Sequence, residues 1–147
     1  MKYKLIIDKT KDEEITVIAH APSALTEAIE NLVCQLSGAD SIMGYEEDGM
    51  RKLPFSEIEC ITVLDRKVMA IDTDGRRYRV QDRLRDLETV LPGYFIRINK
   101  STIANEHRIL RFDAGLGGGV DAVFRSGYRD YVSRRCFAEI RRRYEGV

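Results

Sequence analysis

The residues best suited to chemistry lie in two short stretches of this 147-residue chain, residues 97–101 and residues 133–135. The first groups an arginine, an asparagine, a lysine and a serine around the end of an apolar strand pattern. The second places two arginines where a helix is expected to begin, which opposes the helix dipole unless an anion compensates. Such side chains can hold phosphates and read the edges of bases. The two stretches therefore indicate a nucleic-acid contact.

Each stretch also has a plainer explanation. The first could be the solvated edge of a sheet, and its residue types alone do not decide between the two explanations. Arg135 could pair with Glu139 or with Asp130 instead of a phosphate. The basic run 141–143 is expected to flank the apolar face of the last helix as solvated charge, with only a secondary part in phosphate contact.

Other chemistries lack the spacing they need. To match a dinucleotide-binding loop, the glycine cluster at 115–119 would need a glycine at the position of Val120, so we expect a flexible hairpin loop. Ser101, Ser133 and the histidines form no recognisable pair of nucleophile and base, so we predict no catalytic residue. An enzyme is the most distant of the functional hypotheses.

The cysteines and histidines predict neither a metal nor a cofactor. Cys34, Cys60 and Cys136 are odd in number and widely spaced, which fits neither a disulfide framework nor paired zinc ligands. We expect them to be small, buried thiols in a reducing compartment. His20 and His107 have no cysteine or carboxylate at ligand spacing.

The net charge of zero hides an uneven distribution. Residues 1–50 carry 4 Lys and Arg against 10 Asp and Glu, whereas residues 51–147 carry 20 against 14. This division indicates an acidic appendage beside a basic unit that faces nucleic acid. The longest nearly uncharged stretch is interrupted by polar side chains, and the chain opens without a signal-peptide pattern, so we expect a cytoplasmic protein.

In the appendage, residues 1–50, the pattern predicts two strands and a helix. Alternating or apolar runs predict the strands over residues 3–7 and 15–19. Apolar residues at helical spacing follow, with Ser23 as the expected N-cap and Gly38 as the expected stop.

In the second unit, residues 51–147, the pattern changes to short strands separated by turns. Asp82 is expected to cap a helix over residues 84–91, and Ser133 a last helix. The last helix has Phe137, Ile140 and Tyr144 on its expected buried face. Strands are expected over residues 58–64, 67–71, 76–80, 94–98, 107–112, 120–125 and 128–132. A further strand is expected over residues 41–45, before the boundary between the two units.

Several ordered blocks at compatible spacing lie in the second unit. They are Phe55-Ser56-Glu57-Ile58-Glu59-Cys60-Ile61, Leu84-x-x-Leu87-Glu88 before Leu91-Pro92, Phe95-x-Arg97-Ile98-Asn99-Lys100-Ser101, Ile103-x-Asn105 and Val132-Ser133-Arg134-Arg135. Through them, residues from about 52 to 144 resemble the LytTR DNA-binding domain of bacterial transcription regulators. The resemblance implies a mainly β (α+β) fold of short antiparallel strands with two or three helices. Such a domain lies along duplex DNA and sends loops into successive major grooves.

The resemblance also implies roles for single residues. Members of the family typically read bases from three positions, of which the second falls on Lys100 and the third on Arg135. The first falls near Arg66 or Lys67. The expected DNA backbone contacts or supports are Arg97, Asn99, Ser101, Asn105, Ser133 and Arg134.

Many members of the family carry a receiver domain, which this chain lacks, so it looks like the small stand-alone LytTR regulators. The resemblance implies double-stranded promoter DNA with repeated half-sites as the partner, a homodimer on that DNA and no small-molecule substrate. Some stand-alone regulators are held in check by a membrane protein. Residues 1–50 could then serve dimerisation, inhibitor binding or shielding of the basic face.

A binding module for RNA or for another protein is the main competing hypothesis. RNA-binding domains usually offer exposed aromatic side chains on which bases stack. Tyr78, Tyr94, Tyr128 and Tyr131 could serve this purpose, or they could belong to the core.

Overall fold

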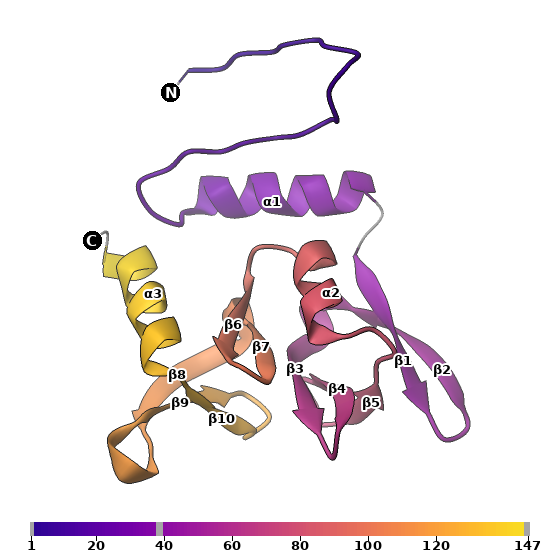
Figure 1. The fold of residues 1–147 in the computed structure, drawn as a ribbon, viewed down its shortest axis with the longest axis vertical. Helices are drawn as coiled ribbons and strands as arrows, with labels where there is room; N and C mark the ends of the chain where they lie inside the picture. The colour runs from indigo at the N-terminus through magenta and orange to yellow at the C-terminus, as the bar shows by residue number, and fades with distance from the viewer. Residues whose placement is uncertain (1, 38–39, 146–147) are drawn as a thin grey trace.

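The computed structural model describes residues 2–37 and 40–145, which form ten strands and three α-helices. Seven strands make one antiparallel sheet in the order β2-β1-β5-β4-β3-β7-β6, and three make a second in the order β10-β9-β8 (Figure 1). The mainly β prediction is confirmed. The elements are α1 (Ala24–Ser37), β1 (Ser41–Glu46), β2 (Gly49–Pro54), β3 (Ile58–Leu64), β4 (Lys67–Asp72), β5 (Arg77–Arg79), α2 (Leu84–Val90), β6 (Phe95–Asn99), β7 (Thr102–Asn105), β8 (Ile109–Ala114), β9 (Val120–Phe124), β10 (Arg129–Val132) and α3 (Arg134–Glu145).

The larger sheet is covered on both faces, because alternate side chains of a strand point to opposite sides. In β7, Ile103 joins the cluster that α2 completes, and Ala104 joins the cluster that the small sheet and α3 complete. Figure 1 shows α3 beside the small sheet and α2 over the larger one. The first cluster includes Leu53, Phe55, Ile58, Ile61, Tyr78, Leu84, Leu87 and Phe95; the second includes Cys60, Ile71, Ile98, Phe124, Val132 and Ile140.

A buried carboxylate joins the two sheets. Glu59 of β3 is fully buried, and it accepts hydrogen bonds from the backbone N–H of Ser126 at 3.1 Å and from the hydroxyl of Ser126. Ser126 lies in the turn between β9 and β10. A buried polar side chain needs such hydrogen-bond partners, so this contact fixes the small sheet against the larger one.

Two strands were missed by the sequence patterns. β2 carries Arg51 and Lys52 exposed on an edge of the sheet, so it lacks the apolar alternation of a covered strand. β7 lies where no strand is predicted; it is only four residues long, and all four are buried. Residues at a buried central position need no polar alternation, which explains why the pattern failed there.

The helix ends test three predicted caps. Ser133 caps α3, because its Oγ accepts a hydrogen bond from the N–H of Cys136 at 3.2 Å. The prediction of Asp82 as a cap was wrong: the residue before α2 is Arg83, and no side chain caps the helix there. Burial of Leu84 and Leu87 stabilises α2 instead. In α3, Ile140 is buried as predicted, but Tyr144 is 58% exposed.

The predicted strands over residues 3–7 and 15–19 do not form. Residues 2–23 contain no strand, and their side chains are exposed. The predicted helix is present as α1, and Ser23 caps it by accepting a hydrogen bond from the N–H of Thr26 at 3.3 Å. Gly38, the predicted stop, lies outside the described residues. The first two segments lack the neighbouring strand that a ladder requires.

The division of the chain near residue 50 stays a prediction. The sheet crosses this position, because β1 pairs with β2 in a hairpin whose last pair is Glu46 with Gly49. β1 in turn pairs with β5 through Tyr45 and Arg79.

Candidate nucleic-acid interface

Residues 40–145, which we call the β domain, contain three turns that meet at one end of the central hairpins. The backbone N–H of Val63, near the end of β3, donates to the carbonyl oxygen of Ser101 at 3.0 Å. The N–H of Ser133 donates to the carbonyl oxygen of Ile98 at 2.8 Å. These bonds join the β3–β4 turn, the β6–β7 turn and the start of α3, and we call residues 65–67, 99–101 and 133–135 the three-turn edge.

The β6–β7 turn is held from inside by Asn99, which is 2% exposed. Its Nδ2 donates to the carbonyl oxygen of Tyr131 at 2.8 Å, and its Oδ1 accepts from the N–H of Ser101 at 2.8 Å. The amide therefore connects β10 to the turn. Lys100 sits at the tip with an exposed side chain.

Arg97 supports the same turn from outside. Its Nε donates to Oε1 of Glu88 at 2.8 Å, and its Nη1 donates to the carbonyl oxygen of Lys100 at 3.1 Å. An arginine that is already engaged on two sides braces a loop. Its position thus fits a support for Lys100.

A chain of hydroxyl groups lies beneath the edge. The Thr102 hydroxyl donates to Oδ2 of Asp130 at 2.6 Å, and the Thr62 hydroxyl lies 2.7 Å from that of Thr102. Since the hydroxyl hydrogen of Thr102 is donated to Asp130, the Thr62 hydroxyl is the donor to Thr102. Strands β3, β7 and β10 are thereby joined where the three turns begin.

Burial, together with nearby Cys60 and Asp130, raises the pKa of Tyr128 to about 12.

The start of α3 presents two exposed arginines. Arg134 is exposed and, among the described residues, has no hydrogen bond or ion pair. The Arg135 side chain is 91% exposed, with its Nε 3.9 Å from Oε1 of Glu139. The proposed pairing of Arg135 with Glu139 therefore exists, but an exposed pair at this distance is worth little. Asp130, the other suggested partner, bonds to Thr102 instead.

The β3–β4 turn brings Arg66 and Lys67 to the same end. Asp65 and Arg66 both have positive φ angles, 49° and 66°, which is the geometry of a two-residue type I′ hairpin turn. Both basic side chains are exposed, and within the described part of the chain neither has a hydrogen bond or ion pair. The structure thus brings together Arg66, Lys67, Lys100, Arg134 and Arg135.

Asn105 is the exception among the predicted residues. It lies at the opposite end of β7 and is 1% exposed. Its Nδ2 donates to the carbonyl oxygen of Ile58 at 3.0 Å, and its Oδ1 accepts from the N–H of His107 at 3.0 Å. A phosphate cannot reach this side chain, so any support it gives is internal to the fold.

The four tyrosines considered for base stacking are mostly occupied in the fold. Tyr78 is 1% exposed, Tyr128 is half-buried, and Tyr94 stacks on His107 with ring centroids 4.3 Å apart. Tyr131 is 49% exposed and is the one of the four that offers a free aromatic surface.

The sequence did not predict the contacts that hold the edge together, which are those of Glu88, Thr62, Thr102 and Asp130. One available signal is polar: Thr62, like Glu59, interrupts the apolar residues of β3. Buried polar side chains need partners, so an isolated threonine in a buried strand suggests a cross-strand hydrogen bond.

Metal ligation finds little support in the described residues. They contain no group of three or more His, Cys, Asp or Glu side chains that could hold a metal ion. Cys60 is a buried free thiol, and burial raises its pKa. Cys136 is half-buried and free, whereas the side chain of Cys34 lies outside the described set. No described helix is long and apolar enough to cross a membrane.

Comparison with known proteins gives consistent results. The family model of the LytTr DNA-binding domain matches residues 48–145. Two Staphylococcus aureus proteins, from strains MSSA476 and NCTC 8325, are each 30% identical over 145 residues, which cover 97% of both chains, and both are named uncharacterized HTH-type transcriptional regulators. The LytTr DNA-binding domain of a putative methyl-accepting/DNA response regulator from Bacillus cereus has the same fold, with a TM-score of 0.64 and 22% identity over 71% of this chain and 96% of that one.

The fold separates this chain from a helix-turn-helix protein. That motif needs two helices joined by a short turn, whereas strands separate α1, α2 and α3 in the described element order.

Proposed function

This chain belongs to the LytTR DNA-binding domain family, and we propose that it is a sequence-specific transcription regulator that binds promoter DNA through the three-turn edge. One observation carries the proposal: five exposed cationic side chains lie on three turns that the backbone joins. Double-stranded DNA attracts such a cluster through its phosphates, and base contacts in the major groove then give specificity.

In this proposal the surroundings of each residue determine whether it reads bases, contacts phosphates or supports the fold. Lys100 and Arg135 are the base readers, and Arg66 or Lys67 is the third, because these side chains are exposed and lie at the tips. Arg134 contacts the phosphates. Lys or Arg pairing with guanine is the commonest specific contact in the major groove. The three turns would enter successive grooves along one side of the duplex.

The buried and braced residues have a different role. Arg97, Asn99 and Ser101 set the position of Lys100, and Ser133 sets the start of α3. Asn105 supports the fold alone. No residue is assigned to catalysis or to a cofactor.

The remaining parts of the proposal concern the setting. The regulator acts in the bacterial cytoplasm, where promoter DNA lies, as two copies on repeated half-sites. A partner acts through the acidic residues 1–50, and a membrane-protein inhibitor is one such partner. The names of the S. aureus relatives support a role in transcription.

The test is a fluorescence-anisotropy titration of the full chain against a duplex from its own upstream region and against a scrambled duplex. We expect tighter binding to the promoter, and log K should fall linearly as log salt concentration rises. Equal affinity for both duplexes, or no salt dependence, would contradict the proposal. An RNA of the promoter sequence is the third sample, and tighter binding to it would favour the RNA-binding alternative.

A further inference from the structure

One face of the larger sheet is only partly covered. Cross-strand partners in an antiparallel ladder point to the same side of the sheet, and one such row runs from β5 to β7 through Arg79, Met69, Thr62 and Thr102. Thr62 and Thr102 are buried, and Asp130 of the small sheet accepts the hydrogen bond of Thr102. Arg79, at the other end of the row, is exposed. The small sheet thus covers this face at β3 and β7 and leaves it open at β5.

The open part of this face is basic. Strands β1, β2, β4 and β5 alternate four basic side chains onto it, namely Lys52, Lys67, Arg77 and Arg79. The acidic residues of the same strands, Glu46 and Asp72, alternate onto the opposite face. All four basic side chains are exposed, and within the described part of the chain none of them has a hydrogen bond or ion pair. This surface is therefore complementary in charge to an anionic partner.

Arg79 lies next to the three-turn edge. Lys67, which belongs to the edge, is two residues from Met69 on β4, and Met69 is the cross-strand partner of Arg79. Lys67 and Arg79 are therefore diagonal neighbours, a relationship that places residues about 7–8 Å apart. Arg77 pairs with Ile71, two residues farther along β4, which takes it about 7 Å farther from the edge. The edge thus continues onto the sheet through Arg79 and not through Arg77.

The two neighbouring cations, Lys67 and Arg79, carry like charges, which repel each other across a sheet. A phosphate that lies between them would replace this repulsion by attraction, because an ammonium and a guanidinium both donate charge-assisted hydrogen bonds to phosphate oxygens. Arg79 is therefore better placed to bind an anion than to stabilise the fold.

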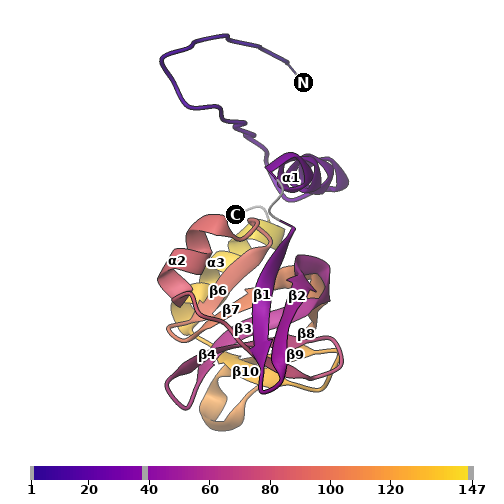
Figure 2. The ribbon, with the colours of Figure 1, turned by 90° about the vertical axis from the view of Figure 1, so that its right-hand side faces the viewer.

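The acidic helix α1 lies away from this face. Figures 1 and 2 show α1 and the segment before it at the end of the molecule where α3 ends, whereas β3, β4 and β10 lie toward the other end. Glu27 of α1 is 3.8 Å from Nε2 of His107. His107 comes just after β7 and Lys100 just before it, so this contact is at the opposite end of β7 from the three-turn edge. In the described structure α1 neither neutralises Arg79 nor shields the basic edge.

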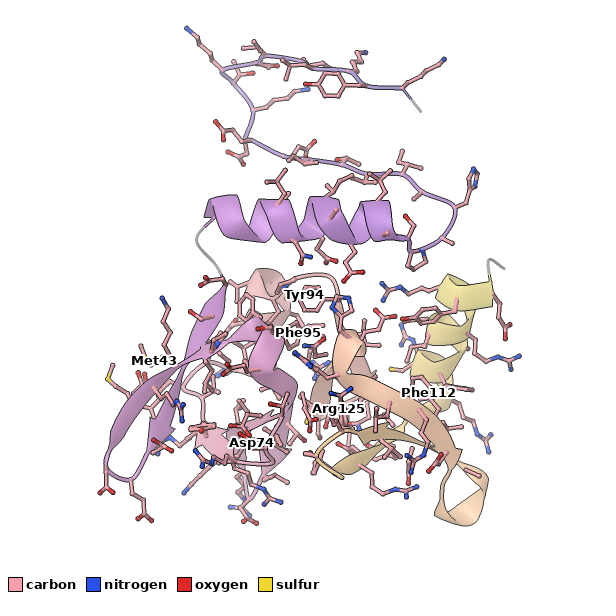
Figure 3. The ribbon with its side chains drawn as sticks, turned by 180° about the vertical axis from the view of Figure 1, so that it is seen from behind. Met43, Asp74, Tyr94, Phe95, Phe112 and Arg125 are labelled. Atoms are coloured by element: carbon pink, nitrogen blue, oxygen red, sulfur yellow. The ribbon has the colours of Figure 1, made fainter. Side chains whose placement is uncertain are left out.

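Duplex DNA fits Arg79 better than an acidic protein does. Protein interfaces are held by apolar side chains at their centre, and the exposed methionines of this face, Met43 and Met50, are on β1 and β2. Figure 3 shows Met43 at one side of the molecule. Arg79 is instead continuous with the edge that the proposed function assigns to DNA. Because Arg79 lies on a strand behind the turn, it meets the DNA backbone and does not enter a groove as a turn does.

We propose that Arg79 is a further DNA contact, which together with Lys67 holds a backbone phosphate beside the groove that the β3–β4 turn enters. Arg66, at the tip of that turn, is then the third base reader, and Lys67 contacts the backbone. Since β5 and the start of α3 flank opposite sides of the edge, Arg79 extends the contact away from α3. The inference rests on the proposed function, and it adds a residue that lies outside the sequence blocks considered for DNA contact.

Matched variants on one strand test the contact. Arg79→Gln and Arg77→Gln remove the same charge from the same face, and both are titrated against the promoter duplex and the scrambled duplex over a range of salt concentrations. Arg79→Gln should weaken binding to both duplexes about fivefold at about 0.15 M salt and lower the slope of log K against log salt by about 0.9, as expected for one lost phosphate contact. Arg77→Gln should bind as wild type does. Equal slopes for the two variants would overturn the proposal.

The comparison of the two duplexes separates a phosphate contact from base reading. A loss of affinity confined to the promoter duplex would make Arg79 a base reader and contradict the phosphate assignment. Unchanged DNA binding of Arg79→Gln would also overturn the proposal and leave this surface to an acidic protein. If the wild type bound both duplexes equally, promoter recognition would fail, but Arg79→Gln and Arg77→Gln on the scrambled duplex would still decide the phosphate contact.

A charge-retaining variant distinguishes binding from a structural role. Arg79→Lys should keep the wild-type slope, because lysine binds phosphate as a point charge. Urea denaturation without DNA should give Arg79→Gln a midpoint equal to or above that of wild type, since the repulsion from Lys67 is lost. A lower midpoint together with a slope that lysine does not restore would make Arg79 a structural residue, and the proposal would be wrong.

Uncharged phosphates locate the contact on the DNA. Methylphosphonate groups replace single phosphates of the promoter duplex, one position at a time, beside the base pair whose discrimination depends on Arg66. At one position the wild type and Arg77→Gln should lose more affinity than Arg79→Gln does, because only they retain the side chain that contacts this phosphate. If every substitution weakens the wild type and Arg79→Gln by the same factor, Arg79 contacts no phosphate and the proposal is overturned.

Discussion

The backbone N–H of Ser133 donates to the carbonyl oxygen of Ile98 at 2.8 Å, and this bond places the first turn of α3 beside the end of β6. It is a bond between main-chain atoms, so it does not depend on the charged side chains nearby. Lys100 and Arg135 therefore extend from one frame, and either can be replaced without removing the bonds that position the other. Replacing an exposed side chain such as Lys100 and a buried supporting side chain such as Asn99 separately therefore distinguishes DNA contact from support of the fold.

The support is tested at Asn99. Asn99→Ala removes two hydrogen bonds that link the β6–β7 turn to β10 and leaves buried partners unsatisfied, so it should lower the free energy of unfolding by about 1–3 kcal/mol. DNA affinity should fall with it. Lys100→Ala is the control, because its exposed side chain contributes to binding alone. Urea denaturation gives the stability of both variants, and fluorescence anisotropy gives their DNA affinity. If Lys100→Ala were as unstable as Asn99→Ala, Lys100 would be a structural residue and not an exposed DNA contact.

Arg66 offers a test in which stability and affinity change in opposite directions. Its φ angle of 66° is strained for a residue with a Cβ, and glycine removes that strain. Arg66→Gly should stabilise the fold by roughly 0.5–1 kcal/mol and still weaken DNA binding, since the guanidinium is lost. Arg66→Ala keeps the strain and loses the same charge. Thermal unfolding should separate the two variants, and equal stability would show that the turn is not strained.

Tyr128 predicts a loss of stability in alkali. Its folded pKa is raised from 10.0 to about 12, chiefly by burial, so the unfolded chain releases this proton first as the pH rises. The stabilising contribution is therefore complete below pH 10 and disappears between pH 10 and about 12. Two further groups add to the same decline: Cys60, whose pKa is raised by burial, and Tyr144, whose pKa is raised by partial burial and by its hydrogen bond to Glu106. Tyr128→Phe should flatten the decline in urea midpoints over this window, and an equally steep variant would refute the assignment.

Local patterns predicted much of the β domain. β3 begins and ends at the predicted residues, and β4 extends one residue beyond its prediction, because strong apolar runs flank a turn of Asp65 and Arg66. β7 could not be found, since a four-residue buried strand depends on its neighbours in the sheet. The strands predicted over 3–7 and 15–19 failed for the converse reason: the pattern is present, but these residues pair with no strand of the described sheets.

The exposed residues of the candidate site could be predicted from the sequence more readily than the contacts that support them. Exposed Lys100 and Arg135 belong to short sequence blocks, so local spacing locates them. The contacts of Arg97 with Glu88 and of Thr102 with Asp130 join residues far apart in the chain, and only the fold brings them together. Asn105 also belongs to a short sequence block, but its side chain is buried and donates to the carbonyl oxygen of Ile58, which local spacing could not indicate.

The central claim is that the three-turn edge reads bases, and Arg135 tests it most directly. Arg135→Ala and the control Arg142→Ala, an exposed arginine farther along α3, should be titrated against the promoter site and against a set of single base-pair substitutions of it. We predict that Arg135→Ala costs about 1–3 kcal/mol on the intact site and removes discrimination at one position only. Arg142→Ala should keep the wild-type base preferences. An Arg135→Ala protein that binds every duplex more weakly by the same factor would make Arg135 a phosphate contact and contradict the claim.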